Sequence, residues 1–127
     1  MITEDYVNFE TAKLLKEKGF DECPLFRYDD CGQLWVQGGY DKTTNWHFPA
    51  PTLQMVMKWL REVYNKHCHV SFDYVLGWYV QIVDTKETAY IYDDEEMKIY
   101  HPEQDCGFNS YEEACEAAIR YTLENLI

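Results

Sequence analysis

Residues 66–83, KHCHVSFDYVLGWYVQIV, begin with four repeats of alternating polar and apolar side chains, from His67 to Tyr74. In an extended chain, successive side chains point to opposite faces, so one face becomes apolar and the other polar. The apolar face receives Cys68, Val70, Phe72 and Tyr74, and the polar face receives His67, His69, Ser71 and Asp73. The alternation therefore predicts a half-buried β-strand.

The residues that follow predict an antiparallel meander. Leu76-Gly77 indicates a turn, and 78–83 is a second strand with Trp78, Val80 and Ile82 on one side. Residues 88–92 form a predicted third strand, and 97–100 a short fourth one. Each connection is short enough for antiparallel neighbours, whereas parallel neighbours need a long crossover.

The segment PAPTLQMVMKWLREVYNK (49–66) predicts a helix that begins at Pro51 or Thr52. Met55 and Trp59 lie beside its apolar stripe and widen the apolar arc to about 200°, against roughly 100° or more for a helix packed on one side. Two interpretations follow: burial on both sides, against the loop that carries Trp46, or an exposed patch for a partner. The stripe itself consists of Leu53, Val56, Met57, Leu60, Val63 and Tyr64.

Two further helices are predicted near the ends of the sequence. The first has Thr3 or Asn8 as its N-cap and ends at Gly19. The last begins at the capping box of Ser110 and Glu113. Small residues in the middle of its apolar stripe permit a close approach to a sheet; the stripe contains Ala114, Cys115 and Ala118.

A β-hairpin is predicted between the first two helices, because the apolar runs 25–28 and 34–36 flank the turn Asp29-Asp30-Cys31-Gly32. Residues 38–45 are then expected to form a surface loop. The element order is α-β-β-α-β-β-β-(β)-α. It predicts a single α+β domain over residues 1–127, with helices packed on one antiparallel sheet in two layers.

The charge of the chain restricts its partners. The formal net charge is −12, from 23 acidic and 11 basic side chains. We therefore expect neither direct nucleic-acid binding, which needs clustered Lys and Arg, nor binding to an anionic membrane. No apolar run reaches the roughly 18 residues that span a bilayer. The acidic start MITEDYVNFE differs from a secretion signal, so a cytoplasmic location is expected.

The segment KHCHV raises the question of a metal or thiol site. On a strand, His67 and His69 share a face and could bind one ion, while Cys68 points to the opposite face. The spacing of the sequence offers no third ligand, so the two histidines are weak metal candidates, and a metal-dependent enzyme is the weaker functional alternative. Five scattered cysteines without a Cys-x-x-Cys pair argue for reduced thiols.

Motifs for other chemistries are missing from the sequence. There is no Gly-x-Ser-x-Gly, no glycine-rich phosphate loop and no dinucleotide fingerprint. The acidic run DDEE at 93–96 lacks the spacing of a calcium loop and is typical of a charged turn. We therefore predict no catalytic residue and no cofactor, and expect that the chain is not an enzyme.

The abundance of aromatic residues instead points to protein binding. The chain has 11 tyrosines and 4 tryptophans, residue types that are enriched at protein interfaces. The candidate binding residues are Met55, Trp59, Tyr79, Tyr90 and Tyr92, and the partner is another protein or a second copy of the chain. The net charge also allows an alternative function, that of an acidic inhibitor that imitates nucleic acid and blocks a basic DNA-handling protein.

Three segments also carry a family resemblance: NFETAKLLKEKGFDE (8–22), APTLQMVMKWLREVY (50–64) and SYEEACEAAIRYTLENLI (110–127). They resemble a family of small uncharacterised proteins from gut anaerobic bacteria and their prophages or other mobile elements. The resemblance covers roughly half of the chain and contains no catalytic residue. It implies a context, that of an accessory protein of a mobile element, and no functional site.

Overall fold

The computed structural model describes residues 2–22, 24–36, 39–75, 77–87, 89–93 and 107–127. These residues form three helices and two three-stranded antiparallel sheets. The α+β class predicted from the sequence is therefore confirmed. The predicted fourth strand at 97–100 and most of the acidic run 93–96 lie outside the described residues.

The larger sheet is the predicted meander. It contains β4 (Lys66–Asp73), β5 (Gly77–Asp84) and β6 (Ala89–Asp93) in the order β4-β5-β6. The register of β4 and β5 is regular over eight residue pairs, from Lys66 opposite Asp84 to Asp73 opposite Gly77. A shift between Ile82 and Val83 interrupts the pairing of β5 with β6.

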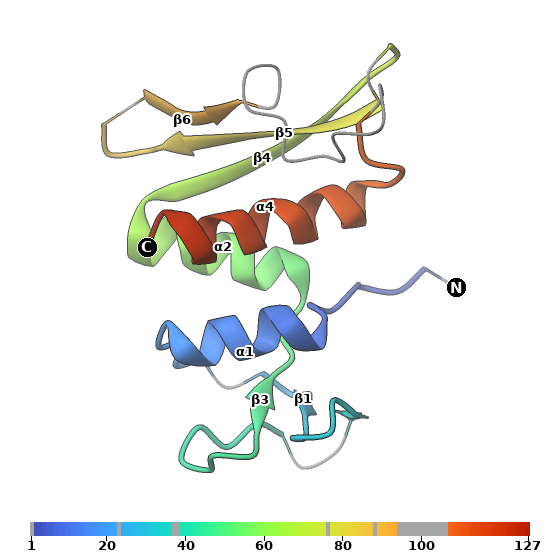
Figure 1. The fold of residues 1–127 in the computed structure, drawn as a ribbon, viewed down its shortest axis with the longest axis vertical. Helices are drawn as coiled ribbons and strands as arrows, with labels where there is room; N and C mark the ends of the chain where they lie inside the picture. Colours follow the sequence, from blue (N-terminus) through green and yellow to red (C-terminus); the bar gives the residue numbers. More distant parts are fainter. Residues whose placement is uncertain (1, 23, 37–38, 76, 88, 94–106) are drawn as a thin grey trace.

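Two helices cover one face of this sheet: α2 (Leu53–Tyr64) and α4 (Tyr111–Asn125) (Figure 1). Both helices begin at N-caps that the sequence predicts. The Thr52 hydroxyl accepts a hydrogen bond from the Met55 amide, and the Ser110 hydroxyl accepts one from the Glu113 amide. The small residues of α4 lie in the core, where their size allows close approach. Ala114, Cys115 and Ala118 are fully buried.

The smaller sheet lies at the opposite end of the molecule, beyond α1 (Phe9–Glu17) (Figure 1). Its strands are β1 (Arg27–Tyr28), β2 (Leu34–Trp35) and β3 (Phe48–Pro49), in the order β2-β1-β3. The predicted hairpin is β1–β2, and β3 was not predicted. The expectation of one sheet in two layers needs correction, because the helices lie between two separate sheets.

Polar side chains connect this smaller sheet and its loops to neighbouring segments. The Tyr28 hydroxyl donates to the Val7 carbonyl at 2.6 Å, and the Arg27 guanidinium donates to the Gly39 carbonyl at 2.9 Å. The Lys16 ammonium donates to the Thr44 carbonyl and to the His47 carbonyl. Strands of two residues have few ladder hydrogen bonds, so these side-chain contacts help to fix them, together with ring packing between α1 and the strands β1 and β3.

A single carboxylate connects α4 to the start of α1. Oε1 of Glu116 accepts from the Asn8 amide at 2.9 Å and from the buried hydroxyl of Thr11 at 2.7 Å. The negative charge therefore lies at the positive end of the α1 dipole, which is a favourable position. Around this contact, the helices and β4–β5 share one continuous apolar core.

Candidate functional site

The two histidines of KHCHV lie close together on β4. Their ring centroids are 6.1 Å apart, His67 is half-buried and His69 is exposed. The register places Val83 opposite His67 and Gln81 opposite His69, and neither side chain is a carboxylate or an imidazole. Burial lowers the pKa of His67, and the positive Arg61 lowers it further. Within the described part of the chain, the two histidines therefore have no third metal ligand beside them.

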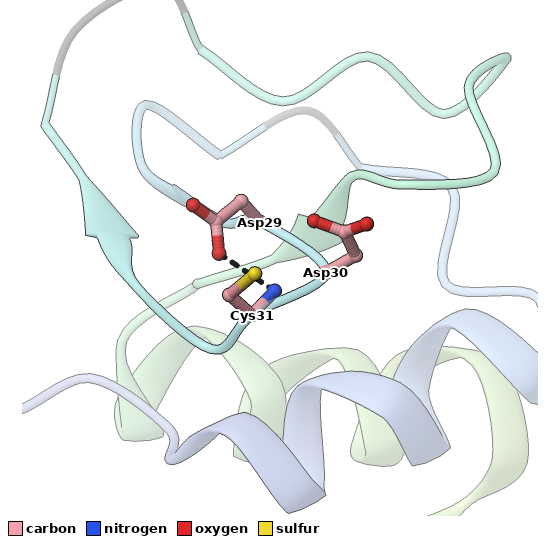
Figure 2. Close-up of side chains that lie close together, drawn as sticks. All are labelled: Asp29, Asp30 and Cys31. Atoms are coloured by element: carbon pink, nitrogen blue, oxygen red, sulfur yellow. Dashed lines mark hydrogen bonds between the residues drawn. The ribbon is translucent and has the colours of Figure 1, made fainter.

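Within the residues that the structure describes, one group of side chains has the proximity that a metal site needs: Asp29, Asp30 and Cys31 (Figure 2). The Asp29 carboxylate is already committed to the hairpin. It accepts from the amides of Cys31 and Gln33 and from the indole of Trp35, each at 2.9 Å. These hydrogen bonds lower the pKa of Asp29, and the bond from Trp35 has the largest effect. The arrangement is that of an Asx turn that closes β1–β2.

The cysteines have the environment of unreactive thiols. At the hairpin turn, the charges of Asp30 and then Asp29 raise the pKa of the exposed Cys31. Burial raises the pKa of Cys68 to about 11, and that of Cys115 also to about 11. A nucleophilic cysteine needs a lowered pKa, so none of these three thiols has the required electrostatics. Cys23 and Cys106 lie outside the described residues.

The structure separates the two residues of the candidate patch on α2. Trp59 is only 5% exposed, and its ring packs on Phe20 at 5.1 Å and on Tyr64 at 5.2 Å. The indole therefore belongs to the core, and it contacts the end of the α1 region rather than the loop of Trp46, which is itself exposed. Met55 is 41% exposed and stays on the surface.

The predicted burial of Val63, on the same helix, also needs correction. The periodicity places Val63 in the buried stripe, but its side chain is 54% exposed. Met55 and Val63 are eight residues apart, so they lie on the same side of α2, one near each end. The exposed apolar side of α2 therefore runs from Met55 to Val63, with Trp59 beneath it.

Two hollows meet at Met55. The first, of about 260 Å³, is lined by Glu22, Met55, Lys58, Trp59, Glu62 and Val63. The second, of about 110 Å³, lies between Met55 and the segment before β1, and its wall includes Tyr6, Pro24, Leu25, Phe26 and Pro51. Leu25 is 80% exposed at the rim of the second hollow. We call the two hollows together the Met55 surface.

Sequence reasoning missed Leu25, Tyr6 and Phe26 as members of this surface. Leu25 belongs to an apolar run that predicts a strand, and strand prediction does not say which elements lie next to it. The contact between this segment and α2 joins residues about thirty positions apart in the sequence. A signal was nevertheless present, since Leu25 directly follows Pro24, which cannot donate a backbone hydrogen bond to a sheet.

The predicted tyrosine candidates lie on the larger sheet, on other elements than the Met55 surface. Tyr79 is half-buried on β5, and the backbones of Tyr90 and Tyr92 pair with Val83 and Ile82. The tip of the β4–β5 hairpin is a further apolar surface, because Phe72, Tyr74 and Val75 are exposed. The alternation predicts that Phe72 and Tyr74 face inward, but the tip rises away from the helix layer (Figure 1).

The comparisons with known proteins give no family. No protein-family model matches the chain, and neither a curated protein nor a solved structure matches it. Among the described residues, no helix has the length and apolar character needed to cross a membrane.

Proposed function

We propose that this chain acts by binding another protein, and that the Met55 surface is where the partner docks. The observation that carries the proposal is that the exposed side chain of Met55 lines both hollows, of which the first has charged side chains at its edge and the second has mainly apolar walls. An apolar centre with a polar rim is the usual anatomy of a protein interface. The proposal agrees with a role as an accessory protein without catalytic activity.

The chemistry of the other candidates supports this choice. The Asp29 carboxylate is occupied by three donors, and the buried thiols of Cys68 and Cys115 have raised pKa values. Each of these groups is accounted for by the stability of the fold. Leu25 and Met55 are exposed apolar side chains that line the same hollow, and grouped apolar exposure is typical of an interaction site.

The acidic inhibitor is the second candidate function, and the net charge of −12 is what favours it. Such an inhibitor needs carboxylates that point outward in an array. Several carboxylates here are instead used within the fold, since Asp29, Asp84 and Glu116 each accept hydrogen bonds from neighbouring segments. For this reason we place the apolar surface first.

A pair of near-isosteric substitutions tests the proposed function. The variant Leu25→Asn with Met55→Gln makes the surface polar without adding charge or removing much volume. Purified wild-type protein and variant are used as bait in lysate of the source cells, and captured proteins are compared by quantitative mass spectrometry. We expect at least about a tenfold loss of the specific partner, as for removal of anchor residues.

The matched control is Val75→Thr, which changes an exposed apolar side chain of similar character at the hairpin tip. It should leave the captured set unchanged. Thermal unfolding of all three proteins shows whether the fold is retained. Equal capture by wild type and by the folded double variant would rule out the Met55 surface as the docking site.

A further inference from the structure

The first hollow of the Met55 surface has the spacing of a helix-docking groove. Five of its lining residues come from α2: Met55, Lys58, Trp59, Glu62 and Val63. The last four follow Met55 by three, four, seven and eight residues, and this spacing places all five on one side of the helix. At 1.5 Å per residue this side is about 12 Å long, or a little over two turns. A second helix laid along α2 would meet an apolar strip with Trp59 as its floor.

The charges at the edges of the groove are mostly acidic. Glu22 faces the groove from the segment after α1, and Glu62 stands on α2. Lys58 is the basic residue of the lining, and its 4.0 Å pair with Glu62 joins two side chains that are each about two-thirds exposed. Such a pair contributes little, so it leaves the Glu62 carboxylate available to a stronger cation. The net charge of −12 adds a long-range attraction for a basic partner.

From these two observations we propose that the first hollow binds a basic amphipathic helix of another protein. Its apolar stripe packs on Met55, Trp59 and Val63, and its flanking Lys or Arg side chains pair with Glu22 and Glu62. A second copy of this chain is the less favourable occupant, because two bodies of charge −12 repel each other. The inference rests on the proposed function and specifies the chemistry of the partner.

Defined peptides test this chemistry. One peptide of about 18 residues carries leucines at helical i, i+3, i+4 and i+7 spacing and lysines on the other face. A second peptide replaces the lysines by glutamates, and a third has the composition of the first with the leucines in scrambled order. Their affinities for the full chain are measured by fluorescence anisotropy at about 50 mM and about 500 mM NaCl.

We expect the basic amphipathic peptide to bind at least about tenfold more tightly than either of the other two. The variant Met55→Gln with Val63→Thr should weaken it at least about tenfold, because the apolar contact is lost. The variant Glu22→Gln with Glu62→Gln should weaken it less and reduce its salt dependence. As a matched control, Glu112→Gln with Glu124→Gln removes the same charge elsewhere and should preserve most of the affinity.

Other results would overturn the inference. If the scrambled peptide binds as tightly as the amphipathic one, the acidic charge of this protein alone attracts it, as expected of an imitation of nucleic acid. Equal binding of the acidic peptide means that the rim does not select charge. Self-association that strengthens with salt and disappears in Met55→Gln with Val63→Thr means that a second copy covers the groove.

The failure of this inference and of the proposed function can be told apart. If no peptide binds, while capture of the cellular partner still depends on Leu25 and Met55, the surface binds a protein of different chemistry. If capture does not depend on these residues either, both proposals fail.

Discussion

The two sheets of this molecule are stabilised in different ways. In the larger sheet, β4 and β5 pair over eight residues, and Val80 and Ile82 are fully buried beneath the helices. In the smaller sheet each strand has two residues, and Leu34 and Trp35 of β2 are exposed. Apolar burial beneath the helices holds the first sheet, whereas the second depends on the packing of Phe9 against Tyr28 and Phe48 together with polar contacts from neighbouring segments.

The stability of the molecule is therefore distributed unevenly between its two ends. Burial is non-directional and adds up over a large contact area, so long strands and helices share one core. Polar contacts fix geometry but contribute less net stability each. We therefore expect substitutions to have global effects near the larger sheet and local effects near the smaller one.

The largest expected effect is that of truncating a core residue on α2. Leu60 is fully buried, so Leu60→Ala should lower the free energy of unfolding by about 2–5 kcal/mol. The measurement is urea unfolding followed by circular dichroism. The matched control is Val63→Ala on the exposed side of the same helix, for which we expect a change below about 1 kcal/mol. Similar losses in both variants would contradict the placement of the core.

The contact between α4 and α1 comes next. Glu116→Ala removes the acceptor of the Asn8 amide and leaves the buried Thr11 hydroxyl without it, so a loss of about 1–3 kcal/mol is expected. Urea unfolding again measures the change. Glu124→Ala, which breaks an exposed pair with Arg120, should cost less than about 0.5 kcal/mol. A Glu116 variant as stable as the Glu124 variant would show that the polar link is dispensable.

A smaller and local effect is expected at the hairpin turn. Asp29→Ala removes the acceptor for Cys31, Gln33 and Trp35, so amide hydrogen exchange should accelerate within β1 and β2. Exchange within β4 and β5 should not change. Asp30→Ala, on the next residue of the turn, serves as the control and should have a weaker effect. Faster exchange throughout the larger sheet would contradict the independence of the two sheets.

The smallest expected effect concerns pH and the loop before β3. Burial lowers the pKa of His47, the nearby Arg27 and Lys16 act in the same direction, and Asp41 opposes them. The folded state therefore favours the neutral imidazole, whose Nδ1 accepts from the Asp41 amide at 3.2 Å. This stabilisation is complete above a pH of about 6.5 and is lost as the pH falls from there toward the lowered folded pKa.

Urea midpoints at a pH of about 7.5 and about 5.5 measure this dependence. His47→Gln should reduce the difference between the two midpoints. His67→Gln should also reduce it, because burial lowers the pKa of His67 in the same direction. An unchanged difference in the His47 variant would remove His47 as the source.

Local patterns predicted most of the elements but not their partners. The caps at Thr52 and Ser110, the turn at Gly32 and the β4–β5 hairpin involve residues close in sequence, so their residue types suffice to indicate them. The pairing of β1 with β3 and the burial of Trp59 against Phe20 join distant segments. Periodicity carries no information about such contacts, so the sequence predicts neither the pairing of β1 with β3 nor Phe20 as the neighbour that buries Trp59.

The candidate site shows the same division. The width of the apolar arc on α2 allows two interpretations of Met55 and Trp59, burial on both sides of the helix or an exposed patch. Whether each side chain is exposed depends on what packs beside α2: Phe20 buries Trp59, while the segment with Leu25 leaves Met55 between two hollows.

The α+β class, the order of most elements and the acidic character of the surface can be read from the amino-acid sequence, because they follow from composition and local periodicity. The division of the strands between two sheets and the exposure of Met55 and Val63 depend on how the folded chain packs. Burial is a property of contacts between distant segments. A periodic pattern shows which side of a helix can be buried, and the packing of the whole chain determines which side is.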